Sequence, residues 1–175
     1  LVTANYYREY QKYIQDSTNT IPQPVPPSIT ELSNDYAGLQ NYKMISDNMI
    51  LNSVVFKPLF GQKAAAPLRA TIKVIQAAGS TASVSEIKTL VVANMNAYFD
   101  IALWNFGDTF YFSELAAYIH SQIGTYVASV VLVPLNPQKS FGDLYEIQCA
   151  PNQIFVNGAT INDIEVINSL TSTNL

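Results

Sequence analysis

A change of hydrophobic period is the feature that most constrains the fold of this chain. Residues 70–76 (ATIKVIQ) are rich in β-branched residues and alternate between apolar and polar positions, as in a strand with one buried face. After a short turn, apolar residues recur every three or four positions from Val84 to Tyr98. Ser83 precedes Glu86 by three positions, which is a capping-box pattern. The sequence therefore predicts a strand followed by an amphipathic helix over 83–100.

A second helix and a buried strand are predicted next. Ser113 is a suitable N-cap, and Leu115, Ile119 and Ile123 then fall on one helix face. Gly124 is expected to end this helix in a left-handed conformation. The nearly continuous apolar run over 127–133 predicts a strand that is buried on both faces.

Several further strands are expected around these elements. Tyr145, Ile147 and Cys149 alternate with polar residues, and a last strand is predicted over 164–167. Asn157-Gly158 predicts a two-residue hairpin between 154–156 and 159–161, and a short strand is expected over 53–56. Together these elements indicate an α+β fold, in which a mixed sheet carries two amphipathic helices on one face.

The N-terminal part of the chain is expected to form an arm with a short helix. Tyr6, Tyr10 and Tyr13 recur at helical spacing, and four prolines within 20–29 keep the following stretch extended. We therefore expect an arm over 1–36 and an α+β assembly domain over 37–175. Because the tyrosine stripe carries a large apolar area, either its own domain or another copy must cover it, and we favour another copy.

Composition limits the class of protein and its partners. Of the 175 residues, 49% are hydrophobic and only 13% are charged, against a usual charged share of roughly 25%. A single cysteine rules out an intrachain disulfide, and no apolar stretch approaches the ~20 residues needed to cross a bilayer. We expect no membrane insertion. The chain begins with Leu1 rather than methionine, so we expect a piece of a longer protein.

The charges are unevenly distributed along the chain. Residues 57–88 carry a net charge of +4, whereas residues 100–165 carry seven carboxylates against Lys139 alone, a net charge of −6. Two interpretations stay open, namely complementarity between copies or ordinary solvated faces. The acidic part would repel a nucleic-acid backbone, so we expect no nucleic-acid partner.

A search for catalytic, metal or cofactor chemistry finds no specific pattern. His120 is the only histidine, and with Cys149 it supplies at most two metal ligands. A Cys–His nucleophilic pair is conceivable, but the strand alternation favours Cys149 as a small buried residue. Two Phe-Gly-Asp triplets, 106–108 and 141–143, fit turn formation better than acid–base catalysis. We expect no enzymatic activity, no catalytic or metal-binding residues, and no cofactor.

An aromatic cluster stands out between the two predicted helices. It comprises Trp104, Phe106, Phe110, Tyr111 and Phe112. Such residues can form a stacking platform for sugars or bases, or a core plug between helices. We favour the core plug.

Long ordered stretches of the sequence resemble a known family. They are 57–61, 66–69, 97–101, 104–115, 118–120, 128–134 and 141–147. Together these stretches look like the C-terminal portion of the large baseplate wedge subunit of T4-like contractile-tailed bacteriophages, a relative of the baseplate J-like proteins. The resemblance extends over about 42–167 and leaves the N-terminal arm unplaced.

The resemblance implies a structural role. In that family two copies of the subunit join other wedge proteins, and six wedges close around a hub into the baseplate that triggers sheath contraction. It implies partners that are other copies of the chain and other wedge proteins, and a location in the virion tail baseplate after assembly in the host cytoplasm. It supplies no catalytic residues. A receptor- or carbohydrate-binding tail module is the alternative, with Trp104 and the tyrosines as stacking groups.

Overall fold

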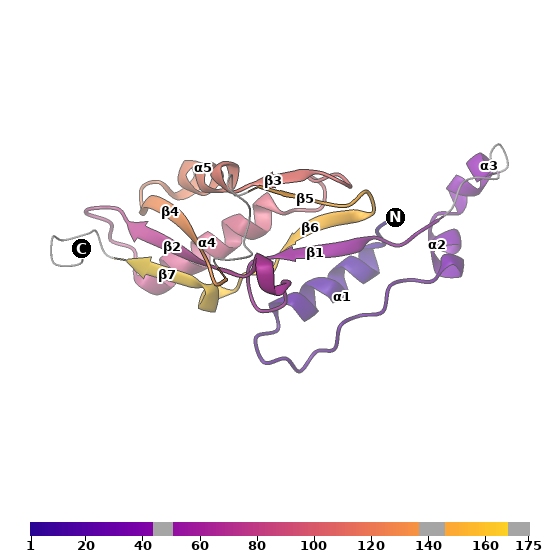
Figure 1. Cartoon of the computed structure of the whole chain (residues 1–175), viewed down its shortest axis with the longest axis horizontal. Coiled ribbons are helices and arrows are strands. Elements are labelled where there is room, and N and C mark those ends of the chain that lie inside the picture. The colour runs from indigo at the N-terminus through magenta and orange to yellow at the C-terminus, as the bar shows by residue number, and fades with distance from the viewer. Residues whose placement is uncertain (44–50, 137–145, 168–175) are drawn as a thin grey trace. The chain divides into compact units, whose positions relative to one another are not determined.

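The computed structural model describes residues 1–43, 51–136 and 146–167 (Figure 1). The chain divides into two compact units, Leu1–Val55 and Phe56–Leu175. The boundary that we expected after residue 36 falls inside the first unit, directly after its second helix.

The first unit begins with the predicted tyrosine-striped helix α1 (Ala4–Gln15). The Thr3 hydroxyl caps it by accepting a hydrogen bond from the Tyr6 backbone N–H at 3.3 Å. Tyr6, Tyr10 and Ile14 are its buried residues, as the helical spacing indicated. Residues 22–28 then form neither helix nor strand, as the prolines predicted.

Sequence analysis missed the second helix, α2 (Ile29–Asp35). It starts with a complete capping box, because the Ser28 backbone N–H donates to Glu31 Oε2 at 2.7 Å and the Ser28 hydroxyl accepts from the Glu31 backbone N–H at 3.3 Å. Its residue Leu32 is only 1% exposed. A short 3-10 turn η1 (Ala37–Leu39) and helix α3 (Gln40–Lys43) follow.

The second unit contains a three-stranded mixed sheet in the order β4-β2-β7. Its strands are β4 (Val127–Pro134), β2 (Ala70–Gln76) and β7 (Ile164–Ile167). Central strand β2 runs antiparallel to β4, with Ile72 opposite Leu132, and parallel to β7, with Ile72 opposite Ile164. The predicted strands over 70–76 and 164–167 are confirmed.

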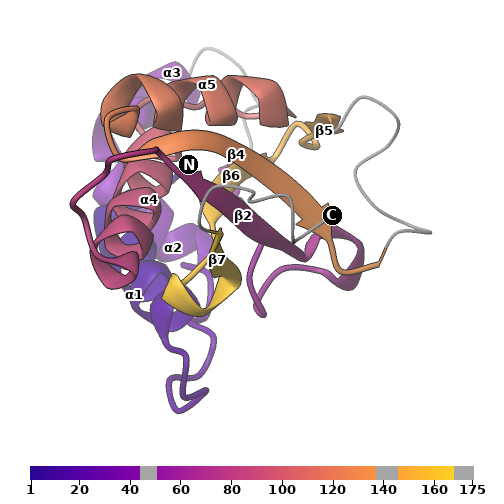
Figure 2. The same ribbon diagram turned by 90° about the vertical axis from the view of Figure 1, so that its left-hand side faces the viewer.

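Two helices cover one face of this sheet (Figure 2). Helix α4 (Val84–Tyr98) has the predicted Ser83–Glu86 capping box, and α5 (Phe112–Ile123) packs against both α4 and β4. Most residues predicted to face inward are buried: Ile87, Val91, Met95, Leu115, Ile119 and Ile123. The two ends of the α4 stripe differ, because Val84 is 46% exposed and Tyr98 is only partly buried. The predicted α+β architecture is therefore confirmed.

The boundaries of α5 differ from the prediction. The helix begins at Phe112 with Tyr111 as N-cap and no side-chain capping bond, so the N-cap assignment of Ser113 was wrong. Strand β3 (Thr109–Tyr111) pairs antiparallel with β5 (Glu146–Gln148) and leads directly into the helix, so sheet pairing sets its start. Gly124 has φ −59°, so a left-handed stop was also wrong.

Strand β4 is buried on one face only, contrary to our expectation. Val127, Val130 and Leu132 are buried, whereas Val131 is 45% exposed. The register shifts between Ile75 and Gln76 of β2, which marks an irregularity in the pairing. The sequence over 127–133 is almost continuously apolar because the outer face of the sheet also carries apolar residues such as Val131.

The hairpin predicted at Asn157-Gly158 is absent from this part of the chain. Strand β6 (Gln153–Asn157) instead pairs with β1 (Val55–Leu59), and the two lie side by side in Figure 1. Residues Ile161–Asp163 form the 3-10 turn η3 that leads into β7, and a further 3-10 turn, η2 (Ala66–Leu68), precedes β2. The strand expected over 53–56 is displaced towards the C-terminus as β1.

At Asn157-Gly158 the backbone lies very close to the backbone of residues 59–61. The Gly158 backbone N–H donates to the Leu59 carbonyl at 2.8 Å. Opposite it, Gly61 adopts φ +57°, and a Cβ added there would lie 1.8 Å from the Gly158 carbonyl oxygen. Only glycine at position 61 is compatible with this approach.

Candidate assembly surfaces

The tyrosines of α1 are largely covered within the single chain. Tyr6 is 7% exposed and Tyr10 is 4% exposed, whereas Tyr13 is half-buried. Burial raises the pKa of Tyr10 far above its ordinary value, and the neighbouring Tyr6 and Tyr13 raise it further. A second copy is therefore not needed to cover Tyr6 or Tyr10. A role of the stripe in an interface stays a prediction, and Tyr13 has the most area left for it.

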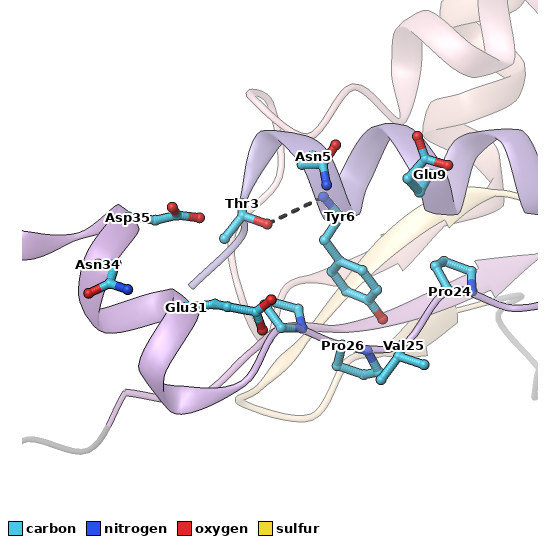
Figure 3. Close-up of a pocket in the computed structure, with 11 residues that line it drawn as sticks. Thr3, Asn5, Tyr6, Glu9, Pro24, Val25, Pro26, Glu31, Asn34 and Asp35 are labelled. Atoms are coloured by element: carbon cyan, nitrogen blue, oxygen red, sulfur yellow. Dashed lines mark hydrogen bonds between the residues drawn. The ribbon is translucent and has the colours of Figure 1, made fainter.

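A pocket of about 480 Å³ lies beside Tyr6 in the first unit. In Figure 3 the Tyr6 ring lies between α1 and the proline segment at Pro24 and Pro26. Two of the carboxylates that line the pocket already have partners, because Glu9 accepts from Lys12 at 2.9 Å and Glu31 accepts from Ser28. These two groups hold the local structure together.

The outer face of the β4-β2-β7 sheet is a second candidate surface. Residues at alternate positions of β2 point away from the helices, and Lys73 forms a 3.2 Å ion pair with Glu165 of β7 on this face. Opposite Lys73 in the β4 register is the exposed Val131. Among residues 1–43, 51–136 and 146–167, no strand pairs with the outer edge of β4. We call this face and edge the open sheet surface.

A pocket of about 390 Å³ lies where α4, the turn after it and α5 meet. Tyr98, Trp104 and Tyr118 contribute aromatic rings, and Asp108 and Glu114 contribute carboxylates. Burial, together with the negative charge of the nearby Glu114 carboxylate, raises the pKa of Tyr98 to about 12. We call this site the aromatic–acidic pocket.

The aromatic cluster of the sequence is thus divided between core and surface. Phe110 is fully buried, and its ring lies 5.9 Å from Phe60 and 6.1 Å from Phe155 between centroids. Phe106 and Tyr111 are 44% and 38% exposed. The core-plug interpretation is therefore correct for Phe110 and wrong for the two exposed rings.

His120 and Cys149 occupy different environments. His120 is exposed in the last turn of α5, whereas Cys149 is 4% exposed within the core. Burial raises the pKa of the Cys149 thiol to about 11, with the Lys57 charge acting against this shift and the Asp108 charge adding to it. Within the part of the chain that the structure describes, no three His, Cys, Asp or Glu residues are grouped to hold a metal ion.

The first Phe-Gly-Asp triplet forms a turn, as the sequence indicated. Gly107 has φ +79° and donates its backbone N–H to the Gln153 carbonyl at 3.2 Å. The Asp108 carboxylate accepts from the Asn105 backbone N–H at 2.7 Å, and the Asp108 carbonyl accepts from the Cys149 N–H at 2.9 Å. The second triplet, over 141–143, lies outside the described residues.

These features define an α+β module with an open sheet surface and an aromatic–acidic pocket. No model of a protein family matches the chain, and no curated protein matches it. None of the helices within the described ranges has the length and hydropathy that crossing a bilayer requires.

Proposed function

We propose that the chain is a structural module of a contractile-phage baseplate wedge, which associates with copies of itself and with other wedge proteins. The resemblance over 42–167 supplies the family, and the open sheet surface is the observation that carries an assembly role. The proposal assigns no catalytic residues, and it places the protein in the baseplate ring that triggers sheath contraction.

The open sheet surface favours assembly for two physical reasons. An exposed strand edge presents unpaired backbone donors and acceptors, which readily pair with a strand of another chain unless charged residues prevent it. Strand β4 carries no charged residue from Val127 to Pro134, and Val131 is 45% exposed within it. Only the Lys73–Glu165 pair brings charge to the adjoining strands. An edge without such protection is typical of a surface that a neighbouring chain covers.

The assembly role can be tested by sedimentation velocity over a range of concentrations. We expect the wild-type chain to self-associate and Val131→Lys to weaken association, since a lysine on the edge opposes strand pairing. Val25→Lys is the matched control, because Val25 is 85% exposed on the proline segment and undergoes the same change. A monomeric wild type would contradict the self-association. Loss of association only in Val25→Lys would place the joint on the arm.

The baseplate assignment requires a separate test. Antibodies raised against the chain should label the baseplate end of contractile tails purified from its source, as seen by immunogold electron microscopy. Labelling of capsids or tail fibres alone, or no labelling of tails from which the chain is recovered by mass spectrometry, would refute the assignment.

A receptor- or carbohydrate-binding tail module is the second candidate function. The aromatic–acidic pocket is the observation that favours it, because aromatic rings beside carboxylates can hold a sugar. A monomeric chain that binds glycans on an array would support this candidate, and a self-associating chain that binds none would support the wedge module.

A further inference from the structure

The aromatic–acidic pocket is built by three consecutive segments of the second unit. Tyr98 ends helix α4, Trp104 lies in the turn after it, and Asp108 directly precedes β3. Glu114 and Tyr118 are four positions apart on α5, so they lie on the same helix face. The pocket walls therefore come from elements that the hydrophobic core already fixes.

The aromatic walls are held in place by their own contacts. The Trp104 indole N–H donates to the Tyr98 carbonyl at 2.7 Å, and the Trp104 ring is stacked on the buried Phe99 with 5.5 Å between centroids. The Tyr98 ring lies 5.6 Å from Trp104 and 5.4 Å from Tyr118. Such rings are preorganised, so a ligand does not have to order them on binding.

The polar groups of the pocket are mainly acceptors with negative charge. Asp108 accepts from the Asn105 N–H, but an ionised carboxylate has about four acceptor positions, so Asp108 and Glu114 both keep capacity for further donors. No ion pair involves either carboxylate within residues 1–43, 51–136 and 146–167, and no lysine or arginine lines the pocket.

We propose that this pocket binds a guanidinium group, supplied by an arginine side chain of a partner chain. A planar guanidinium stacks on aromatic faces and donates hydrogen bonds to carboxylates in parallel pairs. A neutral sugar can use the rings and the acceptors but gains nothing from the negative charge, and a lysine ammonium cannot stack as a flat group. The inference does not depend on the baseplate assignment, because it rests on the chemistry of the pocket alone.

Trp104 makes the proposal directly measurable. It is the only tryptophan of the chain, so selective excitation of tryptophan reports on this pocket. The probe is the peptide acetyl-Gly-Arg-Gly-amide, titrated to millimolar concentrations into the whole chain. Its citrulline counterpart has the same shape without the charge. We expect a saturable change of Trp104 emission with the arginine peptide that weakens with added salt, and no saturable change with the citrulline peptide.

Two variants separate the pocket from general acidity. Glu114→Gln keeps the size and a side-chain acceptor but removes the charge, and it should weaken binding about tenfold, which corresponds to the loss of one charge-assisted hydrogen bond. Glu165→Gln is the matched control, since it removes the same charge from the open sheet surface and should leave binding unchanged.

Three results would overturn the proposal. The first is equal binding of the arginine and citrulline peptides, and the second is equal weakening by Glu114→Gln and Glu165→Gln. The third is a Trp104 response to neutral oligosaccharides without a response to the arginine peptide, which would assign the pocket to sugars. None of these results bears on self-association through the open sheet surface, so a failure here is distinguishable from a failure of the proposed function.

Discussion

Replacing Gly61 by alanine should destabilise the second unit severely, because the substitution meets two independent obstacles. Gly61 adopts φ +57°, a left-handed conformation that costs an L-residue roughly 1–2 kcal/mol. The added Cβ would also lie 1.8 Å from the Gly158 carbonyl oxygen and 2.6 Å from its carbon. Both atoms belong to the backbone, so no side chain can rotate away.

The two costs can be added to give an expected magnitude. Overpacking that forces backbone shifts costs typically about 1–3 kcal/mol, and an overlap with a carbonyl oxygen belongs at the upper end. The sum is about 3–5 kcal/mol for Gly61→Ala. A chain of this size loses about 2–4 °C of Tm per kcal/mol, so we expect a fall of roughly 6–20 °C.

Two other glycines provide matched controls. Gly79 has φ +78° with nothing within 4 Å of a built Cβ, so Gly79→Ala carries the conformational cost alone, about 1 kcal/mol. A Cβ on Gly158 would lie 3.0 Å from the carbonyl oxygens of Leu59 and Phe60, and no left-handed φ is involved. Gly158→Ala therefore tests the contact alone, and we expect a loss of about 1–2 kcal/mol.

Unfolding of these variants can be followed by circular dichroism and by Trp104 fluorescence, which reports on the second unit. The expected order of stability is wild type, then Gly79→Ala and Gly158→Ala, and last Gly61→Ala. If Gly61→Ala unfolds at the same temperature as Gly79→Ala, the close approach of the two backbone segments does not exist as described.

Three further predictions concern the core, the N-cap of helix α4 and the thiol of Cys149. Leu115→Asp places an unpaired charge in a fully buried position, and it should cost about 3–5 kcal/mol, enough to unfold the unit. Ala117→Asp, on the exposed face of α5, should cost less than about 1 kcal/mol. Similar melting temperatures of the two variants would contradict the core assignment. Ser83→Ala removes the cap of α4 and should cost about 1 kcal/mol in urea unfolding, while Ser85→Ala should be nearly neutral. Because burial raises the pKa of Cys149 to about 11, a thiol reagent at neutral pH should label it only after unfolding, and rapid labelling of the folded chain would refute the burial. The free energy of unfolding should also fall as pH rises from about 9 through 11, since the unfolded chain loses this proton first.

Local sequence signals predicted the elements whose structure depends on local contacts. The α4 cap follows from Ser83 and Glu86 alone, and the alternation over 70–76 suffices for β2. The capping box at Ser28 and Glu31 was equally readable, so α2 could have been found from the sequence. Because α2 directly follows the proline run, the predicted arm over 1–36 included it.

The errors occurred where contacts distant in sequence decide the structure. Ser113 is a good N-cap by type, but pairing of β3 with β5 starts the helix earlier. Asn157-Gly158 is a strong hairpin signal, yet the glycine is used for an approach to Leu59, which no local pattern shows. The sequence pointed to Trp104 and the tyrosines as stacking groups, but it did not show that Glu114 and Tyr98 line one pocket, because that depends on the packing of two helices.

The connectivity of the central strand has a consequence for how the nascent chain folds. Strand β2 is synthesised well before its parallel neighbour β7, so the pairing of these two strands has to wait. We expect folding to start from β2, α4, α5 and β4, since closing the longer loop to β7 costs more entropy. Until Ile164 emerges, one edge of β2 is open, and neighbouring nascent chains on the same messenger RNA can pair with it. The β4-β2-β7 sheet can therefore be completed only after β7 has been translated.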